Sequence, residues 1–418
     1  MEKVYEILRY YGLTAEKHRA RLESWPHNQV IDFLIEMYEA MSMVHDRTGA
    51  AYAFIANGPM GGDSSRCSDP ECRIQRVDHT ARFATLYADR VLIPDPFEKF
   101  FGVDEVNERL IEEVSVAIQV LHLIQPTVEA GLIGFATGEY CLCEEHYKEH
   151  AAQADDIRIA CSVLQDQFAG KVRVELRHST VVKDAWDFFV SGPESLLEHG
   201  RIVYVLRKIP DNLANQLDSA GHYVLSMNEI KKFGFLHKLT EPILDDILLQ
   251  SLYVTQGFHY LTDREIDLEV VAAVNDAVTQ DNSSALLSGL SHAVPVVPEA
   301  DLVALTKLRT NEGEAFRVYR DKLNSVTRSF SSETALTQKR VRQAFLDIIE
   351  PELNKLDQTV RDNKRLLFGQ IRQDVIFGAG VVSIGLFCGL FSPTVGEIFA
   401  GLGGFKFVTG LFENKRLM

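Results

Sequence analysis

The chain has 418 residues, of which 46% are hydrophobic and 24% charged, and its formal net charge is −16. This length exceeds one ordinary core and predicts two or three domains, while the composition excludes wholesale disorder. Residues 1–300 hold 26 Lys and Arg against 46 Asp and Glu, which argues against a main body that binds nucleic acid through its phosphates. The N-terminus has no apolar signal segment, so a cytoplasmic location is expected.

Residues 1–150 are predicted to form an α/β domain. A helix is expected over 28–47, a short strand over 51–57, a Gly-, Ser- and Asp-rich loop over 58–72, a buried strand ending the stretch 82–97, and an amphipathic helix over 103–125.

Residues 151–298 are predicted to form a second α/β or α+β domain, either separate from the first or one unit with it. Strands are expected over 171–178, 201–210 and 222–227, followed by mainly helical sequence. The proline-containing segment 291–300 is the best domain boundary, because the composition changes after it.

Residues 301–374 are predicted to form an all-helical stalk. Apolar residues from Phe316 to Phe330 step by three and four, a pattern that favours paired helices packing as a coiled coil. This indicates a homo-oligomer formed through 312–374. The alternative is two helices that lie on the main domain, since neither run sustains four heptads.

Residues 375–418 are predicted to contain a glycine-rich hydrophobic helical hairpin over 375–412. No residue from Val375 to Gly396 is charged, and Gly385 and Gly389 have the small-residue spacing of packed membrane helices. Basic residues flank both ends, so the positive-inside rule would keep both ends cytoplasmic. The alternative is a hairpin buried in a protein core or an oligomer, which Lys406 in the second arm favours because a lysine within the membrane is costly.

Two cysteine pairs indicate a structural zinc site. Cys67 and Cys72 lie in the predicted loop, Cys141 and Cys143 lie one residue apart, and His146 is a possible substitute for one thiolate. Zinc takes four such ligands in a closed tetrahedral site. The Cys-x-Cys spacing is shorter than usual, so two pairs of plain buried thiols, or a redox pair, remain as alternatives.

Catalytic candidates are few. Asp89 and Asp95 bracket an apolar run, and carboxylates at a strand's carboxyl end commonly bind metal or act as acid and base. Asp95 before Pro96 is also explained as a turn former. Asp63 with its two following serines suggests an anion-binding turn but lacks the lysine of a phosphate-binding loop. His259, Asp263 and Asp267 are expected near one helical face, and a capping turn of Thr262 with Glu265 explains most of this pattern.

These features favour a non-enzymatic sensor or interaction protein: a soluble acidic body with a C-terminal hairpin that associates with a membrane or oligomerises. The predicted protein resembles bacterial membrane-acting immunity effectors in architecture alone, because these also join a soluble sensing body to a terminal hydrophobic hairpin. The alternative is a metal-dependent hydrolase that uses Asp89 and Asp95, with the hairpin serving only for dimerisation.

Overall fold

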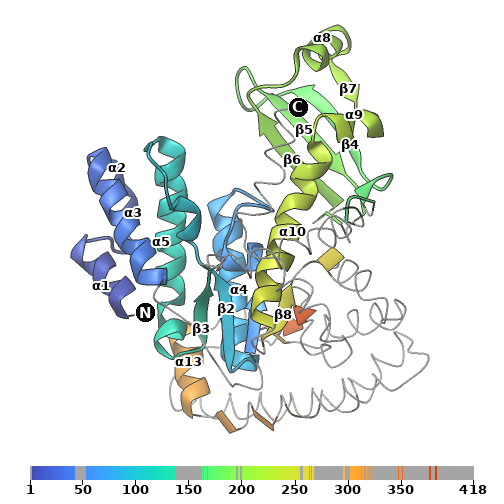
Figure 1. The fold of residues 1–418 in the computed structure, drawn as a ribbon. Coiled ribbons are helices and arrows are strands. Elements are labelled where there is room, and N and C mark those ends of the chain that lie inside the picture. The colour runs from blue at the N-terminus through green and yellow to red at the C-terminus, as the bar shows by residue number, and fades with distance from the viewer. Residues whose placement is uncertain are drawn as a thin grey trace, which may run out of the picture. The chain divides into compact units, whose positions relative to one another are not determined.

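The computed structural model describes residues 2–42, 53–137 and most of 162–262, with short segments beyond them that include 295–296, 302–311, 376–377 and 382–383. The chain forms two compact units. Unit 1 comprises Met1–Tyr140, Leu249–Asp263 and Ala277–Ala400, and unit 2 comprises Cys141–Leu248, Arg264–Asp276 and Gly401–Met418. The described part is a mixed α/β structure with two main sheets (Figure 1), as the composition and periodicity predict.

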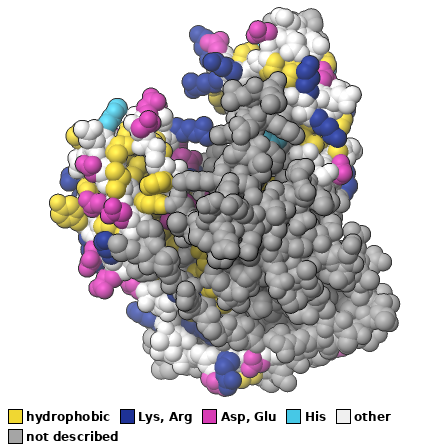
Figure 2. All heavy atoms as spheres, viewed as in Figure 1, with side chains coloured by type: hydrophobic (Ala, Val, Ile, Leu, Met, Phe, Trp, Pro, Cys, Tyr) yellow, Lys and Arg dark blue, Asp and Glu magenta, His cyan; other side chains and the backbone are white. Residues whose placement is uncertain are grey.

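Three helices begin unit 1: α1 (Glu2–Tyr10), α2 (His18–Glu23) and α3 (His27–Ser42). They bury one apolar face, with Val4, Leu8 and Phe33 almost inaccessible to solvent. The hydroxyl of Tyr5 donates to the carbonyl of Leu121 at 3.1 Å, which ties α1 to the long helix α5 (Glu108–Glu129). On the visible face of these helices, hydrophobic, acidic and basic side chains are intermingled rather than gathered by kind (Figure 2).

A mainly parallel sheet forms the centre of unit 1. Its strands are β1 (Ala53–Ala56), β2 (Arg90–Pro94), β3 (Ile133–Ala136), β8 (His259–Thr262) and β11 (Val382–Ser383), in the order β11-β8-β1-β2-β3. Strands β8, β1, β2 and β3 are parallel, and β11 pairs antiparallel with β8. Every residue of β1 and β3 is buried, as expected for parallel strands covered on both faces.

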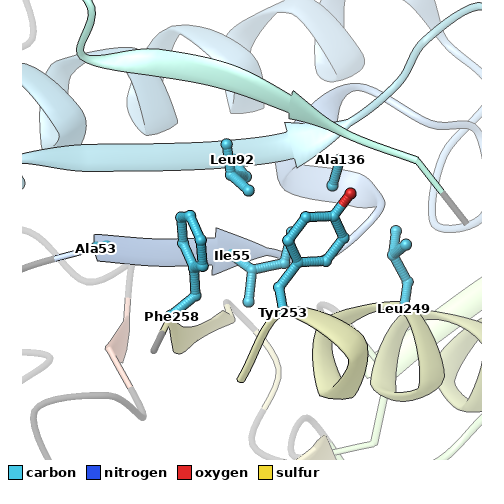
Figure 3. Packing of buried hydrophobic residues seen from close by; sticks show 7 residues of the cluster. All are labelled: Ala53, Ile55, Leu92, Ala136, Leu249, Tyr253 and Phe258. Carbon is cyan, nitrogen blue, oxygen red and sulfur yellow. The ribbon is translucent and has the colours of Figure 1, made fainter. Parts of the chain in front are cut away.

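Helices cover the two faces of this sheet. Phe54 of β1 packs against Phe83 of α4 (Pro70–Tyr87), with ring centroids 5.5 Å apart. The next residue, Ile55, belongs to a buried cluster with Leu249 and Tyr253 of α10 (Phe235–Val254), shown in Figure 3. Because neighbouring residues of a strand point to opposite faces, α4 and the end of α10 lie on opposite sides of the sheet.

Helix α4 corrects the sequence prediction, which extended the loop to residue 72 and expected no helix in the stretch 82–97. The buried strand predicted at the end of that stretch is confirmed as β2. The helix begins at Pro70 and is capped by Asp69, whose side chain accepts from the backbone N–H groups of Glu71 and Cys72. Asp followed by Pro is a turn signal that also starts helices. The helix carries many polar residues, so its periodicity is weak, and the strand is limited to β2.

Unit 2 contains an antiparallel sheet in the order β6-β5-β4-β7. The strands are β4 (Arg173–His178), β5 (Trp186–Ser191), β6 (Arg201–Leu206) and β7 (His222–Val224), and the helices are α8 (Asp211–Ala220), α9 (Met227–Lys232) and the first part of α10. Phe188 of β5 packs against Phe235 of α10, with ring centroids 4.2 Å apart. Strand β5 is absent from the sequence prediction, and the sheet of unit 2 lies in sequence between β3 and β8.

The segments predicted as stalk and hairpin are described only in part. Helix α13 (Leu302–Asn311) packs against α4 and α5 with Leu302 and Leu305 buried. Within 375–412 the structure describes β11 and β10 (Ile376–Phe377), which pairs antiparallel with β9 (Pro295–Val296). The remainder of 375–412 lies outside the described residues. Over the described ranges, no helix is both long and apolar enough to cross a membrane.

Candidate functional site at the carboxyl edge of the parallel sheet

Four polar residues stand at the carboxyl ends of the parallel strands. Asn57 follows β1, Asp95 follows β2, Thr137 follows β3, and Thr262 is the last residue of β8. Parallel strands end at the same edge of a sheet, so these residues share one edge although up to 205 positions separate them in sequence. In open α/β sheets, ligands bind at this edge at the point where the strand order reverses. At that point the neighbours on the two sides of one strand belong to different halves of the sheet. Here that strand is β1, with β2 on one side and β8 on the other.

The junction between β1 and β8 is a buried polar network. Asn57 is fully buried; its side-chain amide donates to the Thr262 hydroxyl at 2.9 Å and its side-chain oxygen accepts from the backbone N–H of Met60 at 3.1 Å. From α10, the Gln250 amide donates to the carbonyls of Ile55 and Leu261, both at 3.0 Å. These bonds hold the ends of the two strands together, because each buried polar group is costly without a partner.

The loop after β1 folds on itself. Its 3₁₀ turn η1 (Pro59–Gly61) and the next residue, Gly62, are buried. The backbone N–H groups of residues 60–63 and 65 all bond within the loop, to Asn57, Gly58, Pro59 or Asp63. A phosphate-binding loop instead presents free N–H groups to its ligand. This loop therefore does not cradle a phosphate in the conformation observed.

Its glycines serve close packing. A Cβ atom on Gly61 would lie 2.8 Å from Cδ of Pro94, at the end of β2. Gly62 has a φ of +89°, and its Cβ would lie 2.8 Å from Val77 of α4. Glycine is required where backbone approaches other atoms this closely or takes positive φ.

Helix α4 anchors the same loop. The Arg73 guanidinium is buried, donates to the carbonyl of Gly62 at 2.8 Å, and pairs with Glu113 of α5 at 3.0 Å. Burial raises the pKa of Glu113, but Lys99 and Arg73 outweigh this effect and hold the pKa below its ordinary value. The hydroxyl of Thr80 donates to the carbonyl of Met60 at 2.9 Å. The loop is thus fixed against α4 and α5.

Asp95 and Glu98 supply acidic groups at the ends of β2 and β3. The Asp95 carboxylate accepts from the backbone N–H of Phe97 at 2.7 Å, before the 3₁₀ turn η2 (Glu98–Phe100). Burial raises the pKa of Asp95 from 3.8 to about 7, and the nearby charge of Glu98 adds to this effect. Carboxylates with pKa values near neutrality, placed at a strand's carboxyl end, are typical of functional sites, although structural networks also produce them.

Thr137 connects Glu98 to Tyr253 of α10. Its hydroxyl donates to Glu98 at 3.2 Å, and its backbone N–H donates to the Tyr253 hydroxyl at 2.8 Å. That hydroxyl donates in turn to the carbonyl of Thr137 at 3.1 Å. Figure 3 shows the Tyr253 hydroxyl directed toward the end of β3, near Ala136.

The structure does not bring Asp89 and Asp95 together. Asp89 precedes β2 and lies 3.4 Å from Arg309 of α13, whereas Asp95 follows the strand. Six residues of extended chain span about 20 Å. A single metal or substrate atom cannot contact both carboxylates over this distance, so a site at the carboxyl edge includes Asp95 only.

Of the residues predicted to bind zinc, the structure describes Cys67 and Cys72. Both are free thiols, with Cys67 half-buried and Cys72 exposed. Cys141, Cys143 and His146 lie outside the described residues, so the zinc site stays a prediction. Among the residues that are described, no three or more His, Cys, Asp and Glu side chains are grouped to hold a metal ion.

Two other sequence expectations take different roles. The Asp63 carboxylate accepts from the backbone N–H and hydroxyl of Ser65, at 2.8 and 2.6 Å, so it closes a turn rather than leaving an anion-binding concavity. His259 and Thr262 lie in strand β8, which corrects the helical face and capping turn predicted there. Thr262 instead bonds Asn57.

Sequence reasoning missed Asn57, Thr137 and Gln250. The one available signal was a polar residue directly after a short apolar strand, as in AFIAN for Asn57. No protein-family model, curated protein or solved structure matches this chain.

Proposed function

We propose that the protein is a sensor in which unit 1 binds a ribose-bearing ligand, a nucleoside or nucleotide, at the carboxyl edge of its parallel sheet. The observation that carries this proposal is the strand order β3-β2-β1-β8, with Asp95 at the end of β2. In doubly wound sheets of this order, an acidic side chain after the second strand hydrogen-bonds the ribose hydroxyls.

The polar groups of this edge favour a ligand that donates hydrogen bonds. Asp95 and Glu98 are acceptors when ionised, and the backbone N–H groups of residues 60–63 and 65 in the loop after β1 are already bonded within the loop. The N-terminus of α4 is also occupied, since Asp69 caps it with a negative charge. Recognition would therefore depend on hydroxyl or amino groups and only weakly on phosphate.

Calorimetric titration of the full chain tests this proposal. The ligands are the four common ribonucleosides, their free bases and their 5′-monophosphates. We expect a nucleoside to bind, its free base to bind much more weakly, and its monophosphate to bind with similar affinity. Asp95→Asn should weaken binding roughly tenfold or more, as loss of a bond to a charged acceptor predicts.

Asp89→Asn is the matched control, because it makes the same change at the other end of the same strand. Its affinity should equal that of the wild type. Absence of binding by every nucleoside, or equal effects of the two substitutions, would contradict the proposal.

A second candidate function is hydrolysis, favoured by the raised pKa of Asp95, which suits a general acid or base near neutral pH. It retains Asp95 from the predicted pair and not Asp89. Chromatography of the same ligands after prolonged incubation tests this function. A product formed by the wild type and by Asp89→Asn, but not by Asp95→Asn, would support it; unchanged ligands would exclude hydrolysis of these compounds.

The output of the sensor is proposed to be membrane association by residues 375–412, for which β10 and β11 would have to leave their sheets, with self-association through 312–374. The support is the sequence: 22 consecutive uncharged residues from Val375 to Gly396, with basic residues on both flanks. Full-length protein should float with anionic liposomes and the 1–374 truncation should not. Equal behaviour of the two proteins would contradict this part of the proposal.

A further inference from the structure

Strand β6 stands at one edge of the antiparallel sheet of unit 2. It pairs along its whole length with β5, and no other strand of the described residues pairs with its outer side. The backbone N–H of Gly192 donates to the carbonyl of Gly200 at 3.0 Å. Because hydrogen-bonded pairs alternate along an antiparallel ladder, every second residue after Gly200 bonds β5: Ile202, Tyr204 and Leu206. The residues between them direct their backbone N–H and carbonyl groups away from the sheet: Arg201, Val203 and Val205.

The outward-facing residues also present apolar side chains to solvent. Val203 is 44% and Val205 is 47% exposed. They lie on the face of Phe189 of β5, opposite the face on which Phe188 packs against α10. No Lys, Pro or Gly, residues that commonly protect a free edge, stands among the residues from 202 to 206. This edge can therefore pair with a further extended chain.

Both ends of this edge are basic. Arg201 begins β6, and Arg207 and Lys208 follow its last residue; all three are exposed, and within the described part of the chain none forms an ion pair. On the same face of the sheet, Glu175 is already paired with two arginines and Asp187 is buried. The edge therefore favours a partner with an apolar segment between acidic groups.

We propose that β6 binds an extended acidic peptide of a partner protein, which adds a strand to the sheet of unit 2. Main-chain hydrogen bonds to the outward-facing residues supply affinity, and alternate side chains of the peptide supply specificity. A second copy of this chain fits less well. An antiparallel register that sets Val203 opposite the second copy's Val205 also sets Arg201 opposite its Arg207, and like charges directly opposite each other are destabilising. This site does not depend on the ligand proposed for unit 1.

Fluorescence anisotropy of a labelled peptide, titrated with the full-length protein, tests the proposal. The probe is ETVTVTE, in which antiparallel pairing sets the valines opposite Val203 and Val205 and the glutamates opposite Arg201 and Arg207. We expect KTVTVTK to bind about fivefold or more weakly, because its charges repel the same arginines. N-methylation of both valines should weaken binding about tenfold or more, since it removes the donors to β6. N-methylation of two threonines should have little effect, because their N–H groups face away from β6.

A charge-reversed variant is the matched test on the protein. Arg201→Glu combined with Arg207→Glu should bind KTVTVTK more tightly than ETVTVTE, with an unchanged midpoint of urea denaturation, since both side chains are exposed. If this variant does not fold, the two methylation patterns decide the question on the wild type. Absence of ETVTVTE binding, or equal losses from the two methylation patterns, would overturn the proposal. A dimer that Val203→Lys dissociates would also overturn it and assign the edge to a second copy.

Discussion

Replacing Asp95 by Asn tests whether its carboxyl group is held in a site that disfavours its charge. The side chain is 9% exposed and directly follows β2, and burial raises its pKa from 3.8 to about 7. Asn has the same shape and keeps an oxygen that can accept from the backbone N–H of Phe97, but it cannot ionise. The substitution therefore removes the titration and leaves the packing.

The direction in which pH changes the unfolding free energy follows from the linkage between folding and proton binding by Asp95. Because the folded state binds this proton more tightly than the unfolded state does, the stability that it contributes is fully present below pH 3.8 and is lost as the pH rises through about 7. Integrated between about pH 5 and pH 8, the loss for the wild type is about 3 kcal/mol. Relative to the wild type, Asp95→Asn should thus gain about 3 kcal/mol in unfolding free energy over that range.

Urea denaturation, monitored by tryptophan fluorescence, measures this difference in unfolding free energy for unit 1. The chain has two tryptophans, Trp25 in unit 1 and Trp186 in unit 2. In a Trp186→Phe background, emission reports only the buried Trp25. Asp89→Asn, in the same background, is the control.

The raised pKa of Asp95 would be refuted if the difference in unfolding free energy between the wild type and Asp95→Asn stayed constant from pH 5 to pH 8. Such a result would mean that Asp95 ionises with its ordinary pKa in the folded protein, and that water or another polar group reaches its carboxylate. A gain of the same size in Asp89→Asn would show instead that the change does not originate at the carboxyl edge.

Two further substitutions test how the loop after β1 is held. Gly61→Ala should destabilise unit 1 by about 1–3 kcal/mol through overpacking against Pro94; Gly313→Ala, which meets nothing within 4 Å, is the control and should be nearly neutral, so equal melting temperatures for the two variants would contradict this packing. Arg73→Met should cost about 1–3 kcal/mol, because Glu113 loses this partner but keeps its ion pair with Lys99. Adding Glu113→Leu should recover part of that loss in urea denaturation, and no recovery would argue against a coupled buried pair.

The elements predicted correctly are those with a strong local pattern. The apolar stripe of α5 and the apolar runs of β1 and β2 are local consequences of helix and strand periodicity. Helix α4 was missed because its polar composition gives a weak stripe and its capping residues resemble a turn. Such a helix is stabilised by tertiary contacts, here with the sheet and α5, which local pattern does not contain.

The residues of the candidate site likewise fall into those that a local sequence pattern indicated and those that only the tertiary structure identified. The sequence alone placed Asp95 at the end of an apolar strand and showed the acidic, uncharged and basic regions of the chain. It could not join Asn57 to Thr262, or Gln250 to the carbonyls of two strands, because these contacts depend on which strands are neighbours. Strand order is set by backbone hydrogen bonds and burial between segments far apart in sequence, so only the tertiary structure decided that Asp95, and not Asp89, shares an edge with them.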